Sequence, residues 1–445
     1  MPELQELASL PAHADPAWTV KFNPTRPLLA SCSTDRTIRL FSYILPSSSP
    51  SEGLPGKDDP QPVFSLMKVI ETEHKRTVRS IAWSPDGRTL ASGSFDSTVG
   101  VWEEVVPTSD DEDDGDEGVY KPEGSDDDDV GGSKEKEWEC VATLEGHESE
   151  CKSVGFSSDG ALLASCSRDK SVWVWEVQPD ADFECIAVMM EHSQDVKGIA
   201  WHPHEEILAS ASYDSNIHLA YDDPDSDWYT FQKLHPSLPL SPPTLPALFR
   251  TSHPSSSPSS SSSSAPQHLI EALLPTQEEQ EADAALQVPE LEEDETVWCV
   301  AWSADGGWMV SGGDTGGLRV WRRTGSQSDS PFEEILHLPA HTRSIFSLAW
   351  SPPITTSPSD LGLIASGGGD GKIIIWQVTK LAGEEGKEVG VDVKPIAAKK
   401  NAHGVADINS VSWCVREDKK GAGLGMLSSA ADDGSVRVWR VVRDD

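Results

Sequence analysis

One stretch of this chain decides its fold: His147-Glu-Ser-Glu-Cys-Lys-Ser-Val-Gly-Phe156, then Leu163-Ala-Ser-Cys-Ser-Arg-Asp169, then Ser171-Val-Trp-Val-Trp175. Apolar and polar residues alternate along these segments, which predicts short β-strands with a turn at Asp169. Versions of this unit recur along the chain, each with an aromatic residue near the end of its first strand and another near the end of its third. The seven copies are anchored at Phe22 with Phe41, Trp83 with Trp102, Phe156 with Trp175, Trp201 with a degenerate end at Ala220, Trp302 with Trp321, Trp350 with Trp376, and Trp413 with Trp439.

A repeat of about 40 residues with Gly-His and Trp-Asp-like positions is typical of WD40 propeller blades. We therefore predict an all-β fold, a seven-bladed WD40 β-propeller, with blades numbered in chain order. The segment Leu4 to Leu10 precedes the first copy and has no blade of its own. We expect it to pair with Val436 to Val441 of the last blade, which would close the ring and cover two sheet edges.

The chain has 445 residues, whereas seven blades need only about 280 to 300. Three insertions account for much of the difference. They are a Ser/Pro loop at 46–62 in blade 1, an acidic loop at 107–136 in blade 2, and a low-complexity segment at 236–295 before blade 5. We expect the last two to lack a packed fold because their composition buries little apolar surface. Within the 236–295 segment, Leu269 to Leu274 could still form a short helix. Ser109 and Ser125 precede acidic runs and are candidate phosphorylation sites, although a solvated loop explains them as well.

The overall composition argues against several functions. The net charge of −39 would repel nucleic acid. The seven Cys include no Cys-x-x-Cys pair, so we expect no zinc or iron–sulfur site and no cofactor. Cys32 and Cys166 occupy the same strand position and are interpreted as small core residues. No signal peptide or membrane span is recognisable, and a reducing intracellular compartment is expected.

Good copies of the repeat can join a His, a Ser, an Asp and a Trp in one hydrogen-bonded chain. The complete sets are His74, Ser92, Asp96 and Trp102; His147, Ser165, Asp169 and Trp175; His341, Ser366, Asp370 and Trp376; and His403, Ser429, Asp433 and Trp439. Ser, His and Asp also form hydrolytic triads. A triad occurs once in an enzyme, whereas this set recurs at a fixed repeat position. We interpret the sets as structural and expect no enzyme activity.

Three blades depart from the pattern, and we expect them to be less rigid. Blade 1 has Phe41 and no clear His, and blade 4 has Ala220 in place of Trp. Blade 5 has Thr315 at the Asp position, and the insertion separates His235 from its own first strand at Thr296-Val-Trp298.

Two repeat positions open on one rim of the central channel of a WD40 propeller. The residues before the turn Asp are Thr34, Phe95, Arg168, Tyr213, Asp314, Gly369 and Asp432, and those four before the first-strand aromatic are Trp18, Arg79, Lys152, Lys197, Trp298, Phe346 and Asn409. Blades 2 to 4 thus bring four cations together with Phe95 and Tyr213. Arginine and aromatic residues anchor interfaces, so we predict a partner site there for an acidic or aromatic peptide, or for a C-terminal carboxylate. The alternative is that the cations only offset neighbouring acids such as Glu150 and Asp195.

Several strings are more specific than a generic WD40 repeat. They are His74-Lys-Arg-Thr-Val-Arg-Ser-Ile-Ala-Trp83, Gly93-Ser-Phe-Asp-Ser-Thr-Val99, Cys166-Ser-Arg-Asp-Lys-Ser-Val-Trp173, Glu191-His-Ser-Gln-Asp-Val-Lys197, Ala211-Ser-Tyr-Asp214 and Ala402-His-Gly-Val-Ala-Asp-Ile-Asn409. These resemble the WD40 subunit of the cytosolic iron–sulfur protein assembly machinery. The resemblance covers essentially every blade and is strongest over residues 63–228, whereas the long insertions have no counterpart in compact members of the family.

The resemblance implies a non-catalytic scaffold that helps to insert clusters into cytosolic and nuclear apoproteins. The implied partners are a small cluster-targeting subunit, a HEAT-repeat adaptor, an iron-only-hydrogenase-like carrier and client apoproteins. Arg168 matches an exposed rim arginine of the family. The resemblance implies a cytoplasmic protein that also enters the nucleus. The alternative is another WD40 peptide reader, such as a ubiquitin-ligase substrate receptor or a chromatin adaptor, because fold alone does not define function.

Overall fold

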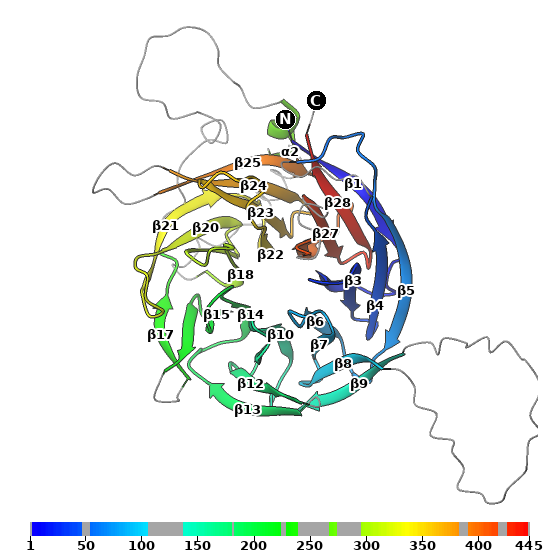
Figure 1. The fold of residues 1–445 in the computed structure, drawn as a ribbon. Coiled ribbons are helices and arrows are strands. Elements are labelled where there is room, and N and C mark those ends of the chain that lie inside the picture. Colours follow the sequence, from blue (N-terminus) through cyan, green and yellow to red (C-terminus); the bar gives the residue numbers. More distant parts are fainter. Residues whose placement is uncertain are drawn as a thin grey trace, which may run out of the picture.

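The computed structural model describes residues 2–46, 54–105, 137–179, 182–223, 228–238, 267–273, 295–381, 390–416 and 425–443. Most of the three predicted insertions, including Ser109 and Ser125, lies outside the described residues. Within those ranges the chain forms a ring of seven four-stranded antiparallel sheets (Figure 1). The ring confirms the predicted all-β, seven-bladed propeller.

Each of blades 1 to 6 is built from four consecutive strands. Blades 1 to 3 comprise β2 (Ala17–Phe22), β3 (Leu28–Ser33), β4 (Thr37–Ile44) and β5 (Val63–Glu71); β6 (Val78–Trp83), β7 (Thr89–Ser94), β8 (Val99–Val105) and β9 (Glu137–Leu144); and β10 (Cys151–Phe156), β11 (Leu162–Ser167), β12 (Val172–Gln178) and β13 (Asp182–Met189). Blades 4 to 6 comprise β14 (Val196–Trp201), β15 (Ile207–Ser212), β16 (Ile217–Asp222) and β17 (Trp228–Leu234); β18 (Val297–Trp302), β19 (Trp308–Gly313), β20 (Gly317–Arg323) and β21 (Phe332–Pro339); and β22 (Ile345–Trp350), β23 (Asp360–Gly368), β24 (Ile373–Lys380) and β25 (Val391–Lys399).

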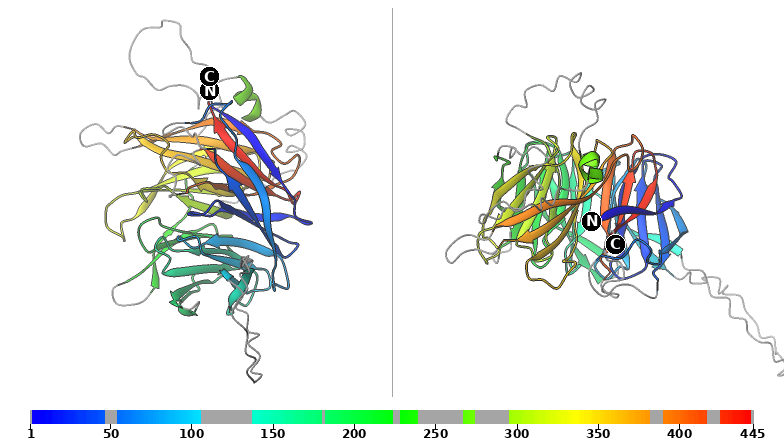
Figure 2. Two further views of the ribbon diagram at one scale, coloured as in Figure 1. Left: turned by 45° about the vertical axis from the view of Figure 1, so that its right-hand side comes forward. Right: turned by 90° about the horizontal axis from the view of Figure 1, so that it is seen from above.

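Blade 7 closes the ring by combining both ends of the chain. It comprises β26 (Ile408–Trp413), β27 (Met426–Ala431), β28 (Val436–Val442) and, as its outer strand, β1 (Glu3–Leu10). Leu4 pairs with Val441 and Leu10 with Val436, as the sequence predicts. Both leucines are buried, and the two termini lie side by side at the edge of the ring (Figure 2).

The first strand of each blade lies innermost, and these seven strands contact one another around the channel. Aromatic residues at their ends hold neighbouring blades together. The indole N–H groups of Trp83, Trp201, Trp302 and Trp413 donate to the carbonyls of Lys21, Gly155, Ala200 and Ala349 in adjacent blades. The strand-end tryptophans are therefore both core residues and links between blades.

The antiparallel strand order gives the ring two different faces. Turns between second and third strands, and connections from one blade to the next, lie on one face, which we call the turn face. The turn Asp of a blade accepts from a backbone N–H two residues later, as between Asp169 and the N–H of Ser171 at 2.9 Å. The residue directly after the turn Asp has a left-handed backbone, with a φ of 73° at Lys170 and 75° at Gly434. Glycine adopts this conformation without strain.

Two of the insertions carry residues that pack onto the ring. The helix α2 (Gln267–Leu273) lies against β25 at the outer edge of blade 6, where Leu269 and Leu273 are buried (Figure 1). This agrees with the short helix considered above, and it shows that part of a segment expected to bury little apolar surface does pack on the ring. In the blade 1 loop, Leu54 packs with Leu4 of β1, and the N–H of Arg443 donates to the Pro55 carbonyl. Among the described residues, no helix is long and apolar enough to cross a bilayer.

Candidate functional site

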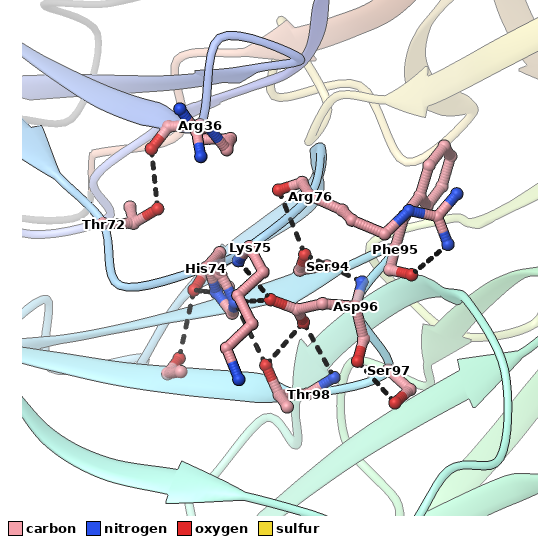
Figure 3. Close-up of polar contacts among 12 residues, drawn as sticks. Arg36, Thr72, His74, Lys75, Arg76, Ser94, Phe95, Asp96, Ser97 and Thr98 are labelled. Carbon is pink, nitrogen blue, oxygen red and sulfur yellow. Dashed lines mark hydrogen bonds and ion pairs between the residues drawn. The ribbon is translucent and has the colours of Figure 1, made fainter.

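In each of the four predicted His, Ser, Asp and Trp sets, the side chains are hydrogen-bonded to one another. The His Nε2 atoms lie 2.7 to 2.9 Å from the Ser hydroxyls of Ser92, Ser165, Ser366 and Ser429. Those hydroxyls accept the indole N–H of Trp102, Trp175, Trp376 and Trp439 at 2.7 to 3.2 Å. The other ring nitrogens face Asp96, Asp169, Asp370 and Asp433 at 2.8 to 3.3 Å. Figure 3 shows the arrangement around His74. The hydroxyls are buried and already bonded, so they are poorly placed as nucleophiles.

The turn aspartates stay ionised within these networks. Burial opposes the charge of Asp370, but the charge and hydrogen bond of His341 outweigh it and hold the pKa of Asp370 below its usual range. In the same way, burial of Asp169 is outweighed by hydrogen bonds from His147 and Ser171, which lower its pKa. An ionised Asp fixes the imidazole orientation, so each network orders its own turn.

Blade 1 corrects one expectation, because it does contain the His. His13 Nε2 lies 2.8 Å from the Ser31 hydroxyl, and its Nδ1 lies 3.0 Å from Asp35. Only the indole donor is missing, since Phe41 stands at that position. The prediction that blade 1 has no clear His was wrong, because His13 keeps the same 18-residue spacing to Ser31 that His74 keeps to Ser92.

Blade 5 replaces the missing imidazole with a buried ion-pair cluster. Arg319 on β20 lies 2.7 Å from Glu295 and 2.5 Å from Glu334, and all three side chains are at most 9% exposed. Glu295 also accepts from Thr315, at the position of the turn Asp. Arg319 further donates to the carbonyl of Leu238. Both ends of the 236–295 insertion are therefore joined to β20 by one guanidinium, which the sequence pattern did not predict.

Blade 4 contains a stacked pair of imidazoles next to its turn Asp. The rings of His192 and His218 lie 3.7 Å apart at an angle of 7°, and His192 bonds Asp214 and Ser210. One nitrogen of each ring and one carboxylate oxygen of Asp214 lie within 4.8 Å of one another. Parallel rings direct their lone pairs alongside each other rather than at a shared ion, and His192 already uses both nitrogens. This geometry does not suit a metal.

The His218 pair predicts a specific pH dependence. Burial, and then the neighbouring charges of His192 and Lys233, lower the pKa of His218 to about 4, against smaller opposing effects of Asp214 and Glu191. The unfolded chain takes up this proton near pH 6.5. Stability from neutral His218 is therefore complete above about pH 6.5 and is lost as the pH falls toward 4, by on the order of 3 kcal/mol.

The substitution His218→Phe keeps a ring against His192 and removes this titration. Urea unfolding at pH 7.5, 6.5, 5.5 and 4.5 should show a shallower fall in stability for His218→Phe than for the unmodified chain. Parallel curves would show that His218 does not contribute.

The predicted rim residues converge on one cavity at the turn face of the channel. Its volume is about 260 Å³, and its lining comprises Trp18, Arg79, Phe95, Lys152, Lys197, Trp298, Phe346, Asp407, Asn409 and Asp432. A second hollow of about 140 Å³ includes Lys21, Arg79, Lys152 and Lys197. Counting along the repeat therefore identified nine of the ten residues that line the first cavity, because each blade presents the same strand register to the channel.

Aromatic rings hold the cations of this cavity. The Arg79 guanidinium lies 4.6 Å from the ring centre of Trp18, and the Lys152 ammonium lies 4.2 Å from that of Phe95. The Lys197 ammonium lies 4.9 Å from the Trp298 ring and equally far from Tyr213. Cations over ring faces are stabilised without losing their charge.

Acids neutralise part of the cationic group. Lys152 pairs with Glu150 at 2.6 Å and Lys197 with Asp195 at 3.4 Å. Arg168 lies 3.8 Å from Glu150 and 3.9 Å from Asp195, with a side chain 58% exposed. Arg79 has no carboxylate within ion-pair distance among the described residues. Neighbouring acids therefore offset the charges of Lys152 and Lys197, as the alternative interpretation expects, but they do not offset the charge of Arg79.

Arg168 and Tyr213 are not part of the cavity wall, although both belong to the turn face. They are exposed beside it, on blades 3 and 4. Sequence reasoning missed Arg76, which lies over the Phe95 ring and donates to the Phe95 carbonyl (Figure 3). Arg76 also pairs with Glu150 at 3.0 Å. Sequence reasoning also missed Asp407, which directly precedes β26. Neither stands at a counted repeat position, so only the folded loops reveal them.

Comparison with known proteins identifies the family. The pattern described as WD domain, G-beta repeat matches seven segments, at residues 4–42, 64–103, 138–176, 183–219, 287–322, 332–377 and 397–440. A protein of Cryptococcus neoformans var. neoformans serotype D (strain JEC21), named "Probable cytosolic iron-sulfur protein assembly protein 1", is 72% identical over the full length of both chains.

More distant relatives have the same name. The protein from Mycosarcoma maydis is 41% identical over 98% of this chain and 92% of its own length. That from Scheffersomyces stipitis is 33% identical over 98% of this chain and 99% of its own. With seven WD repeats and full-length identity of this degree, the chain belongs to the WD40-repeat family of cytosolic iron–sulfur protein assembly protein 1.

Proposed function

We propose that this chain is a non-catalytic scaffold of cytosolic iron–sulfur protein assembly that acts through protein–protein contacts in the cytoplasm. The observation that carries this proposal is the 72% identity, over the full length, to a relative named for that process. The geometry is compatible with it, because the recurring His and Ser residues are buried and are hydrogen-bonded, with the turn Asp residues, in structural networks. The role extends to clients in the nucleus.

The proposed partners are the small cluster-targeting subunit, the HEAT-repeat adaptor, the iron-only-hydrogenase-like carrier and client apoproteins. We place a partner contact at the turn face of blades 2 to 4, where Arg79 lines the cavity without a carboxylate partner among the described residues. The expected ligand segment is acidic or aromatic. The two long ion pairs of Arg168 are weak enough for an incoming carboxylate to replace.

Arg168→Glu tests this surface. Loss of an interface arginine and introduction of a repulsive charge should lower partner capture about tenfold or more. Stability should change by less than about 0.5 kcal/mol because the side chain is exposed. Tagged chains are used to purify partners from cells, and the iron–sulfur assembly subunits are quantified.

The matched control is Arg88→Glu, on the opposite face, where the side chain is 83% exposed. It should capture partners normally. Equal capture by Arg168→Glu and Arg88→Glu would refute the contact surface. Recovery of a cullin-type ligase in place of assembly subunits would refute the scaffold role itself.

A further inference from the structure

The channel cavity has an anionic wall opposite its cationic one. Asp407 and Asp432, both from blade 7, line the same space of about 260 Å³ as Arg79 and Lys152. Asp432 precedes the turn residue Asp433, and Asp407 precedes β26, so the innermost strand and the turn of blade 7 place both carboxylates at the mouth. The cavity is therefore polarised across the channel.

The anionic wall has no bound counter-charge of its own. Among the described residues, no basic side chain lies within 4.0 Å of either carboxylate. Asn409 donates to one oxygen of Asp432 at 2.7 Å, which leaves the other oxygen able to accept. Burial and then the charge of Asp432 raise the pKa of Asp407, while Arg343 acts on it in the opposite direction from a distance. A cation placed between the two carboxylates would remove this repulsion.

The cationic wall is also incompletely compensated. Arg79 stacks on Trp18. Burial lowers the pKa of Arg79, and the charge of Asp432 is among the smaller effects that oppose this shift, although the two side chains form no ion pair. Burial lowers the pKa of Lys152. The pairing with Glu150 opposes this shift, whereas repulsion from Lys197 and Arg79 adds to it. Opposite charges thus face each other across the cavity and do not meet, so a ligand with both charges can satisfy each wall.

Aromatic rings separate the two walls. Trp298 and Phe346 meet edge to face at 5.2 Å and 87°, and Trp18 lies on the other side with Arg79. The volume suits one or two side chains of an extended segment, since larger ligands usually occupy pockets above about 300 Å³. An apolar side chain fits between the rings, flanked by the two charged walls.

We propose that the channel mouth recognises a bipolar peptide segment of a partner protein. Its acidic residue lies against Arg79 and Lys152, its Lys or Arg lies against Asp407 and Asp432, and an apolar residue fills the space between. This inference rests on the proposed function, because it uses the same turn-face surface. It adds that an acidic segment alone is an incomplete ligand.

The test uses peptides with acetylated and amidated ends, so that only side chains carry charge. The parent is Gly-Asp-Phe-Gly-Lys-Gly, together with its reversed order; one variant replaces Lys with Gln, and another replaces Asp with Asn. Each is titrated into the full chain, and indole signals are followed by nuclear magnetic resonance up to millimolar concentrations. The better parent should bind about threefold to tenfold more tightly than its Gln variant at low salt.

Asp407→Asn/Asp432→Asn should abolish this difference and leave binding of the Gln peptide unchanged. Asp407→Asn alone is the second variant, because Asp432 also bonds Asn409 and its loss is more disruptive. Equal affinities of the Lys and Gln peptides for the unmodified chain would overturn the bipolar site while leaving the acidic contact intact. Absence of binding by every peptide, or equal binding of the Asn peptide, would overturn the acidic contact as well.

Discussion

Replacing Arg319 with methionine is expected to lower the free energy of unfolding by about 3 to 5 kcal/mol. The reason is that Glu295 and Glu334 are 7% and 3% exposed and both depend on this guanidinium. Methionine fills much of the volume but leaves two buried carboxylates without a counter-charge. Urea unfolding of both proteins at neutral pH measures the loss.

Arg437 provides a matched control, because it stands opposite Ser429 in blade 7 as Arg319 stands opposite Ser311 in blade 5. Its pair with Glu6 is 3.4 Å long and partly exposed, so Arg437→Met should cost no more than about 1 kcal/mol. Adding Glu295→Gln and Glu334→Gln to Arg319→Met should recover part of the stability. Equal losses for the two arginine variants would contradict a special role for the blade 5 cluster.

Deleting residues 2–10 is expected to prevent stable folding. The deletion removes the buried Leu4 and Leu10, each contributing about 1.5 to 3 kcal/mol, and it exposes the whole edge of β28. That loss approaches the total stability of about 5 to 15 kcal/mol typical of a folded protein. An uncovered edge strand also promotes aggregation. The soluble fraction and the elution volume on size exclusion measure the outcome.

The control is Ser9→Ala, which changes an exposed position of β1 and should behave as the unmodified chain. A peptide of residues 1–11 added during refolding should restore part of the monomeric species, because it can supply the missing strand. A truncated chain that remains monomeric with an unchanged melting temperature would show that β1 contributes little to closure.

The repeat made much of this structure predictable. Strand register is the same in every blade, so residue counting placed Arg79, Lys152, Lys197, Trp18 and Trp298 in the lining of one cavity. His13 also carried a usable signal, because it precedes Ser31 by 18 residues, as His74 precedes Ser92 and His147 precedes Ser165.

Other features could not be predicted from the repeat. The ion pair between Arg319 and Glu334 joins the adjacent strands β20 and β21, and no position of the repeat specifies either side chain. Counting assigned Arg168 and Tyr213 to the correct face but did not reveal their distance from the channel axis. Packing of Leu269 and Leu273 on β25 depends on a surface made by blade 6, far along the chain. These features arise from tertiary contacts rather than from local pattern.

Pairing of β1 with β28 also sets an order of events during protein synthesis. The strand β1 must wait for its partner β28, which is synthesised more than 400 residues later. At about 5 to 20 residues per second, that wait lasts roughly 20 to 90 s. Throughout it, the apolar side chains Leu4 and Leu10 lack their final neighbours, and blade 7 cannot be completed before β28 has emerged. Chaperones that bind nascent chains are therefore expected to contact this protein at β1 until β28 is available.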